Sequence, residues 1–514
     1  MPGQKHPKEM TLEELIGQTL TIGVPGTKVT PEIVRHFKEL NAGGLILYRI
    51  NFESPSQIKK FIADLESALG RRILVMADHE GGRVIMFRDG ITVFPDNWAF
   101  GQTGKSKYAA MQGAIESKEL RRLGIDVNLG PVLDVLTDSY SPNIGIRAYG
   151  KDWKLVAEMG IARIRAMQKG GVSACAKHFP GKGHAPVDAH LGLPTIRSTW
   201  DEMEALHLKP FLSAIESGID MVMTSHPYYP NLDADPKNIA TFSRKIVHDY
   251  LRTKLHYQGI ICSDDLEMGA IKEICPIGEA GVRAMNAGHD ILLVCHDLNA
   301  QKEVYNALVA AYKEGRCDRE ELEASVARIQ ALKARRKRRF EGGAPRPEPR
   351  GRAIAHEVCE QGVRFFNETH SPRLPELKGK KVLVLFPQFS SLAQKIMIEK
   401  ETAAEKKFVL KEFGKFGVKP TVQVVGIEPG DAEIAQAREA MRKHDVTVFF
   451  CFDAHLYASN KRLLDEVQTS APSAVVGFLR DFYDIALLKP SVPALTCGGW
   501  RACQIRAIIE RIAK

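Results

Sequence analysis

The densest group of side chains that could do chemistry lies in the segment 177–190, which reads KHFPGKGHAPVDAH. Asp188 and His190 are two residues apart, so the carboxylate can reach the near ring nitrogen of the imidazole on a turn or extended backbone. Such a pair can deliver and reclaim a proton near neutral pH. A surface loop with an ordinary hydrogen bond explains the same two residues, so the spacing alone leaves both interpretations open.

A second group is the carboxylate pair Asp264 and Asp265 in the run GIICSDDLEMGAI. An apolar strand that runs straight into two carboxylates predicts one ionised group that faces a pocket and one that orients its neighbours. We assign the pocket to Asp264 and a structural role to Asp265. The competing interpretation is a helix cap, in which Ser263 or an aspartate caps the helix that follows.

Two further side chains could bind a polar substrate. Asp78 in ADHEGGRV follows a strand-like run, and the glycines after it allow a tight turn. Arg147 in NIGIRAYG has the planar guanidinium that binds paired oxygen atoms. Each of these residues, taken alone, is also explained by a structural salt bridge.

The segments that carry these residues predict a (β/α)8 barrel over residues 1–335. Eight short apolar runs alternate with helical patterns, at 20–24, 43–48, 73–78, 126–131, 172–179, 220–226, 259–264 and 290–297. Polar residues crowd the carboxyl ends of these runs, which is where barrel enzymes build their sites. A doubly wound sheet is the structural alternative.

The remaining chain predicts a second domain. The range 336–369 is interpreted as a linker, and 370–514 as an α/β sandwich with about five parallel strands. This second part contains no Walker loop and no strand–GxGxxG–helix unit, so it does not predict a nucleotide site.

Composition limits the class of protein. The 514 residues are 44% apolar and 26% charged with a net charge of +9, which is typical of a globular protein and too mild a bias for nucleic-acid binding. No apolar run is long enough to cross a membrane. The dispersed cysteines and the absence of a signal-like N-terminus favour a reducing, cytoplasmic location. The sequence does not predict an oligomeric state.

Six ordered segments of residues 1–335 resemble glycoside hydrolase family 3, in its β-N-acetylglucosaminidase branch: TLEELIGQ, ADHEGGRV, LGIDVNLGPVLDV, NIGIRAYG, KHFPGKGHAPVDAHLGLPTI and SDDLEMGAI. The resemblance implies that Asp264 is the nucleophile and that His190, paired with Asp188, is the general acid/base. It also implies the sugar-binding residues, which are Asp78, Arg147, Lys177 and His178.

The chain departs from the family pattern at two places. The loop usually reads G-H-G-D-T, whereas residues 181–185 read GKGHA, so Lys182 and His184 replace an expected His and Asp. Met86 stands where members commonly have a basic residue, and Arg88 is the nearest substitute for it.

The resemblance implies a retaining glycosidase that takes a small carbohydrate substrate derived from peptidoglycan and needs no cofactor or metal. Three alternatives stay open. A neutral histidine base does not repel anions, so phosphate could replace water and make the protein a phosphorylase. The loop residues His178, His184, Asp188 and His190 could instead bind a metal, although their spacing matches no metal motif. The altered loop is also compatible with an inactive sugar-binding protein.

Overall fold

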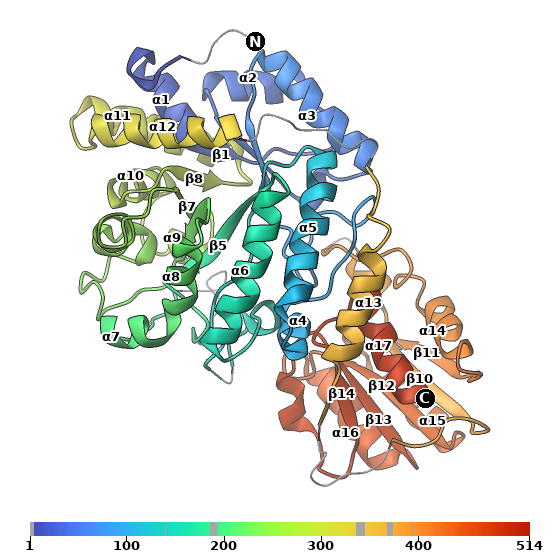
Figure 1. The fold of residues 1–514 in the computed structure, drawn as a ribbon. Coiled ribbons are helices and arrows are strands. Elements are labelled where there is room, and N and C mark those ends of the chain that lie inside the picture. Colours follow the sequence, from blue (N-terminus) through green and yellow to red (C-terminus); the bar gives the residue numbers. More distant parts are fainter. Residues whose placement is uncertain (1–4, 139, 186–192, 336–344, 367–373, 394) are drawn as a thin grey trace.

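The computed structural model describes residues 5–138, 140–185, 193–335, 345–366, 374–393 and 395–514. The first part of the chain forms a closed barrel of eight parallel strands in sequential order, and β1 pairs with β8 to close it (Figure 1). This confirms the predicted barrel over the doubly wound sheet. The strands are β1 (Leu20–Ile22), β2 (Gly44–Leu47), β3 (Leu74–Ala77), β4 (Val127–Asn128), β5 (Ser173–Phe179), β6 (Met221–Thr224), β7 (Ile260–Asp265) and β8 (Ile291–Val294).

Helices surround the barrel, and local signals in the sequence set where they begin and end. The first long helix begins with a reciprocal cap, because Thr11 accepts from the Glu14 N–H at 3.1 Å and Glu14 accepts from the Thr11 N–H at 2.9 Å. The helices are α1 (Leu12–Thr19), α2 (Pro31–Glu39), α3 (Pro55–Leu69), α4 (Asn97–Thr103), α5 (Ser106–Leu123), α6 (Trp153–Lys169), α7 (Trp200–Glu202), α8 (Lys209–Glu216), α9 (Gly269–Lys272), α10 (Ile277–Ala287), α11 (Leu298–Lys313) and α12 (Arg319–Arg335).

Short 3-10 and π segments complete this part of the chain, and two of them bear on the site. These are η3 (Gly145–Arg147), between β4 and α6, and the π segment η4 (Met203–His207), which joins α7 to α8. The others are η1 (Pro7–Glu9), η2 (Arg49–Asn51), η5 (Ala240–Phe242) and η6 (Lys245–Lys254).

The barrel strands are apolar on both faces because helices cover the outside and side chains fill the inside. The interior cluster includes Ile46, Met76, Cys175 and Cys262. The nine cysteines are unpaired, and all but Cys275 are buried, as expected for small hydrophobic side chains. No helix in the described ranges is long and apolar enough to cross a membrane.

The second domain is a six-stranded sheet in the order β11-β10-β12-β13-β14-β9, in which every pairing is parallel except that of β9 with β14. Its strands are β9 (Arg364–Phe366), β10 (Val382–Pro387), β11 (Thr421–Val425), β12 (Val446–Phe452), β13 (Ala474–Leu479) and β14 (Ala494–Thr496). Its helices are α13 (Gly351–Gly362), α14 (Glu405–Gly414), α15 (Asp431–Arg442), α16 (Ala458–Ser470) and α17 (Ala502–Ala513), with short segments η7 (Phe389–Leu392) and η8 (Tyr483–Leu487).

The range 336–369, predicted as a linker, contains α13 and β9 among its described residues. The helix forms because it buries one face against both domains. Ala355, Val358 and Cys359 are buried, and α13 packs against α4 and α5 of the barrel and α17 of the sandwich. The sheet of the second domain therefore begins inside the predicted linker, and α13 joins the two domains (Figure 1).

Candidate active site

The strand-end position of Asp264 places its partly buried carboxylate beside a buried cation. Its side chain is 19% exposed, and its Oδ2 lies 3.7 Å from the Nζ of Lys182. Its Oδ1 accepts from the Asp265 N–H at 2.9 Å. Burial opposes ionisation, but the charges of Lys182, His226 and Lys177 outweigh it and hold the pKa of Asp264 below its ordinary value. The site therefore contains an anion whose Oδ2 makes no hydrogen bond with any residue that the structure describes.

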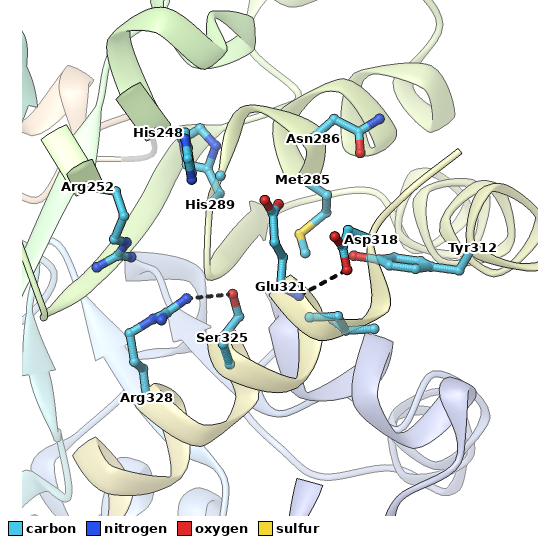
Figure 2. Close-up of a pocket in the computed structure, with 13 residues that line it drawn as sticks. His248, Arg252, Met285, Asn286, His289, Tyr312, Asp318, Glu321, Ser325 and Arg328 are labelled. Carbon is cyan, nitrogen blue, oxygen red and sulfur yellow. Dashed lines mark hydrogen bonds between the residues drawn. The ribbon is translucent and has the colours of Figure 1, made fainter. Parts of the chain in front are cut away.

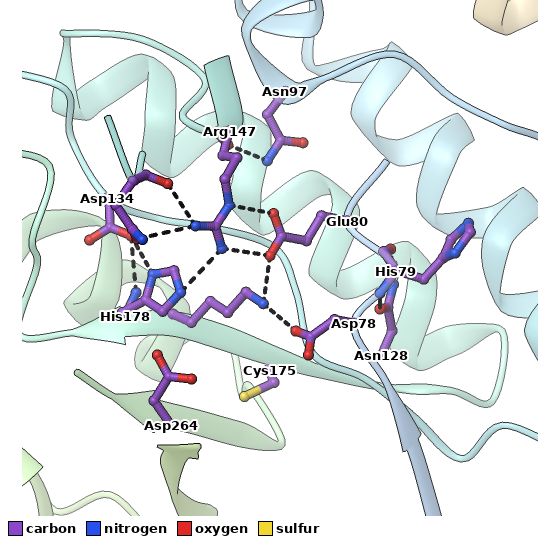
Figure 3. A network of polar contacts seen from close by, with 12 residues as sticks. Asp78, His79, Glu80, Asn97, Asn128, Asp134, Arg147, Cys175, His178 and Asp264 are labelled. Carbon is purple, nitrogen blue, oxygen red and sulfur yellow. Dashed lines mark hydrogen bonds and ion pairs between the residues drawn. The ribbon is translucent and has the colours of Figure 1, made fainter. Parts of the chain in front are cut away.

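The carboxyl ends of β3 and β5 are joined by an ion-pair chain. The Nζ of Lys177 lies 2.5 Å from Asp78 and 2.6 Å from Glu80, and the side chains of Lys177 and Glu80 are almost fully buried. Burial works against the charge on Lys177, but the two carboxylates raise its pKa above the ordinary value. Burial raises the pKa of Asp78. Figure 3 shows Asp78 and Glu80 of this ion-pair network in the same view as Asp264.

Arg147 of η3 has its whole guanidinium directed at protein acceptors. It makes a bidentate pair with Glu80, at 2.9 Å from Nε and 2.8 Å from Nη2. Nη1 donates to the carbonyl and the side-chain oxygen of Asn143, and Nη2 also donates to the Nε2 of His178 at 3.3 Å. An arginine has five N–H donors, so these contacts occupy all of them. Arg147 thus organises its neighbours in this structure.

His178 is fixed as a neutral imidazole. Its Nε2 accepts from Arg147, so Nδ1 carries the proton and donates to Asp134 at 2.7 Å. Burial, and then the charges of Lys182, Arg147 and Lys177, hold the pKa of His178 well below its ordinary value. Asp134 also accepts from the backbone N–H groups of His178 and Lys182, at 3.2 and 2.6 Å. One buried carboxylate therefore orients both residues.

The predicted proton-transfer pair, Asp188 and His190, lies outside the described residues. The described part of the same loop ends beside a histidine stack, in which the rings of His184 and His207 are 3.8 Å apart and nearly parallel. The Nε2 of His184 contacts the hydroxyl of Ser198 at 3.1 Å. Burial lowers the pKa of His184 to about 4 and that of His207 to about 3. Both rings are therefore neutral and anchor this end of the loop.

The residues next to Asp264 contact the backbone of neighbouring segments. Asp265 accepts from the Glu267 and Cys295 N–H groups at 3.2 and 3.3 Å, and burial raises its pKa to about 7. Ser263 accepts from the Leu293 N–H at 3.1 Å. Neither is a helix cap, because α9 begins only after Met268 and has no side-chain cap.

The described members of the alternative metal set do not come together. His178 has both ring nitrogens engaged, and one of them faces a cation. His184 stacks on His207 and contacts Ser198. Among the residues that the structure describes, one group has metal-binding spacing: His356, Glu360 and Glu510, on the partly exposed surface of the second domain and its joining helix.

Two side chains near the altered positions contact the second domain. Arg88 donates to the carbonyl of Ile398 at 2.8 Å, so it is not a substitute for the basic residue expected at Met86. Arg83 donates to the carbonyl of Pro142 at 3.0 Å and lies 3.4 Å from Asp481. Sequence reasoning missed these contacts because nothing in the local pattern reveals which domain a side chain meets.

Sequence reasoning also missed the organising roles of Glu80 and Asp134. Glu80 was visible as one of several polar residues after the third strand, and Asp134 lies in the quoted segment LGPVLDV. Both follow apolar runs at the rim, and that position is the signal by which they could have been found.

A separate cavity of about 150 Å³ lies at the opposite end of the barrel (Figure 2). Gly288 and His289, which line it, directly precede β8, so the cavity lies at the amino ends of the strands. Figure 2 shows Arg328 bonded to Ser325 within it, and both also hold Asp290. These polar groups stabilise the base of the barrel and do not belong to the strand-end site.

The comparisons with known proteins agree with one another on the family that this chain resembles. The model of the glycosyl hydrolase family 3 N-terminal domain matches residues 11–332. A β-hexosaminidase from Methylobacillus flagellatus is 33% identical over 291 residues, which cover 55% of this chain and 82% of that protein.

Two solved structures are similar as well. A glycoside hydrolase family 3 β-N-acetylglucosaminidase from Paenibacillus sp. str. FPU-7 superposes with a TM-score of 0.92 at 29% identity, covering 98% of this chain and 97% of that one. NagZ from Neisseria gonorrhoeae, in complex with N-trifluoroacetyl-D-glucosamine, has a TM-score of 0.53 at 28% identity and covers 66% of this chain and 96% of its own.

Proposed function

The chain belongs to glycosyl hydrolase family 3, and on that premise we propose that it is a retaining β-N-acetylglucosaminidase. The relative from Methylobacillus flagellatus is named a β-hexosaminidase, and the similar structure from Paenibacillus is named a β-N-acetylglucosaminidase, which supports the proposed activity. The observation that carries the proposal most directly is the partly buried, ionised Asp264 at the end of β7, whose Oδ2 makes no hydrogen bond with the described residues. A retaining glycosidase needs one such carboxylate as nucleophile.

In the first step the Oδ2 of Asp264 attacks the anomeric carbon. The other oxygen already accepts from the Asp265 N–H, so Oδ2 is the atom available for bond formation. The bond between the anomeric carbon and the leaving oxygen breaks, and His190 gives that oxygen its proton. Asp188 stabilises the imidazolium before this transfer. The product of the step is a glycosyl-enzyme on Asp264.

In the second step His190, now neutral, takes a proton from water. The water oxygen attacks the anomeric carbon, the bond to Asp264 breaks, and the sugar leaves with its original configuration. The positive charge that forms on His190 is again balanced by Asp188.

The sugar hydroxyls would be bound by the ion-pair chain. Asp78 uses one oxygen for Lys177 and has the other for a sugar hydroxyl, and the ammonium of Lys177 has a third proton beyond those it shares with Asp78 and Glu80. Arg147 and His178 are held by protein partners, so we propose that they hold the ion-paired residues Asp78, Lys177 and Glu80 in place. They bind substrate directly only if they exchange a partner.

The physiological substrate that we propose is a β-N-acetylglucosaminide derived from peptidoglycan, processed in the cytoplasm. This is the substrate class that the sequence resemblance implies.

The deciding experiment is a panel of chromogenic β-glycosides, assayed with and without phosphate. We expect the β-N-acetylglucosaminide to react well ahead of the β-glucoside, with N-acetylglucosamine as product in both buffers. Equal rates on the two sugars would contradict the substrate assignment. Formation of a sugar phosphate would show instead that phosphate is the acceptor.

A further inference from the structure

The barrel segment that carries Arg147 is held by two side chains of the second domain. We propose that Asp481 and Tyr483 are positioning residues for the active site, acting on the segment 141–147. This inference rests on the proposed function, because it gives the second domain a part in that same site. We call these two residues and the segment they hold the interdomain clamp.

Asp481 is the central contact of the interdomain clamp. It follows β13, its side chain is 4% exposed, and its Oδ1 accepts from the Ile146 N–H at 3.2 Å. Its Oδ2 lies 3.4 Å from Arg83, which in turn donates to the carbonyl of Pro142 at 3.0 Å. A carboxylate of the sandwich thus holds the barrel segment directly at one point and through an arginine at another.

Gly145 makes this contact possible. Its φ is +43°, and a Cβ atom there would lie 2.1 Å from the Oδ1 of Asp481. Any side chain at this position would therefore displace the carboxylate as well as strain the backbone. The segment is built to receive a group from the other domain.

Tyr483 holds the same segment nearer its beginning. Its hydroxyl accepts from the Ser141 N–H and donates to the Ser141 carbonyl, both at 2.9 Å. The ring also packs against Tyr140, at 4.9 Å between centroids. The N–H of Ser141 is therefore held by a side chain from the second domain, while its carbonyl accepts from the same hydroxyl and from the Ile144 and Gly145 N–H groups, at 3.1 and 2.8 Å.

The segment 141–147 matters for the site because it carries Arg147. Arg147 ends η3, and its guanidinium joins Glu80 to His178, while Glu80 joins it to Lys177. A shift of the segment would move Arg147 away from these partners and loosen the groups proposed to bind the sugar. Small displacements of positioning groups cost up to about a hundredfold in rate. Asp264 makes no hydrogen bond or ion pair with residues 141–147, all of which the structure describes, so we expect the effect to fall on KM more than on kcat.

Three substitutions in the full-length protein test the clamp. Asp481→Asn removes the charge that faces Arg83, and Tyr483→Phe removes only the hydroxyl that holds Ser141. The matched control is Glu412→Gln, in α14. Glu412 is also a buried carboxylate, but its ion-pair partners, Lys415 and Arg506, both belong to the second domain. A loss that comes only from weakening the sandwich should appear in the control too.

The first measurement is the steady-state kinetics on whichever β-glycoside of the panel the wild type hydrolyses best. We expect KM to rise about tenfold in Asp481→Asn and about fivefold in Tyr483→Phe, with kcat within about twofold of wild type. Glu412→Gln should retain the wild-type KM.

The second measurement is hydrogen exchange of the peptide that spans 141–147. Exchange should accelerate in Asp481→Asn and Tyr483→Phe and stay slow in Glu412→Gln. Wild-type KM and wild-type exchange in both clamp variants would overturn the proposal, and so would equal effects in the control. If the wild type hydrolyses no glycoside of the panel, the proposed function fails, while the exchange data still decide whether the clamp holds the segment.

Discussion

The Nζ of Lys182 lies 3.7 Å from the Oδ2 of Asp264, and the lysine side chain is only 3% exposed. Lys182 is one of the two residues at which the loop departs from the family pattern. The departure therefore puts a positive charge beside the carboxylate that we propose as the nucleophile. Such a charge favours the ionised carboxylate that the first chemical step requires.

Removing this charge should move the acid limb of the pH profile. The pKa of Asp264 is held below its ordinary value, so activity is lost only as the pH falls through that low pKa. In Lys182→Met the pKa of Asp264 rises, and the acid limb of kcat/KM should move to higher pH. Lys182→Arg, which keeps the charge, should leave the limb in place. An unmoved limb in Lys182→Met would show that Lys182 does not control the ionisation.

The two adjacent carboxylates should behave differently when each is neutralised. Asp264→Asn should fold and lose several orders of magnitude in turnover, because no other group can form the covalent intermediate. Asp265→Asn should retain most of the activity, since Asp265 contacts backbone groups. With a fluorinated slow substrate, mass spectrometry should find the label on Asp264. A label on Asp265 would reverse the two roles.

His190 should matter most for substrates whose leaving group needs a proton. His190→Ala should abolish hydrolysis of natural disaccharides but spare the first step on aryl glycosides with acidic leaving groups. Asp188→Ala should show a milder form of the same pattern, because the imidazole remains. The measurement is the ratio of rates on good and poor leaving groups.

Added azide supplies the control for His190, since it attacks the glycosyl-enzyme without needing a base. It should partly restore turnover in His190→Ala. If neither the leaving-group ratio nor the azide response changes, His190 is not the acid/base.

The histidine stack should make the protein sensitive to acid. The pKa of His207 falls from 6.5 to about 3 on folding, so its stabilising effect is complete above pH 6.5 and is lost as the pH falls toward 3. His207→Phe keeps a flat ring against His184 without a titrating group. Between about pH 7 and pH 4.5 it should lose about 2 kcal/mol less stability than wild type. Melting temperatures at the two pH values check this, and parallel losses in both proteins would contradict it.

The barrel was predictable because each strand is an apolar run that ends in polar residues. The strand that precedes Asp78 and the strand that contains Asp264 both show this pattern, and their carboxyl ends must meet at one rim. Asp78 and Lys177 were accordingly expected at the site, and they form a contact of 2.5 Å. These are consequences of local pattern and strand order.

The contacts that the sequence did not reveal depend on distant parts of the chain. The role of Asp134 was not predicted, because a single aspartate in a loop does not indicate which backbone N–H groups its carboxylate accepts from. In the structure these are the N–H groups of His178 and Lys182. Asp481 lies more than three hundred residues from Ile146, and no periodicity relates them. The strand β9 was missed because it is short and its partner β14 is the last strand of the chain.

This last pairing sets an order for biosynthesis. The barrel can close as soon as β8 has been made, because β8 is the partner of β1. By contrast, β9 is the first strand of the second domain, and its partner is β14. Nearly the whole domain therefore has to leave the ribosome before β9 can pair. The barrel can thus fold first, as N-terminal domains generally do during translation, whereas the sheet of the second domain is complete only once β14 has been made.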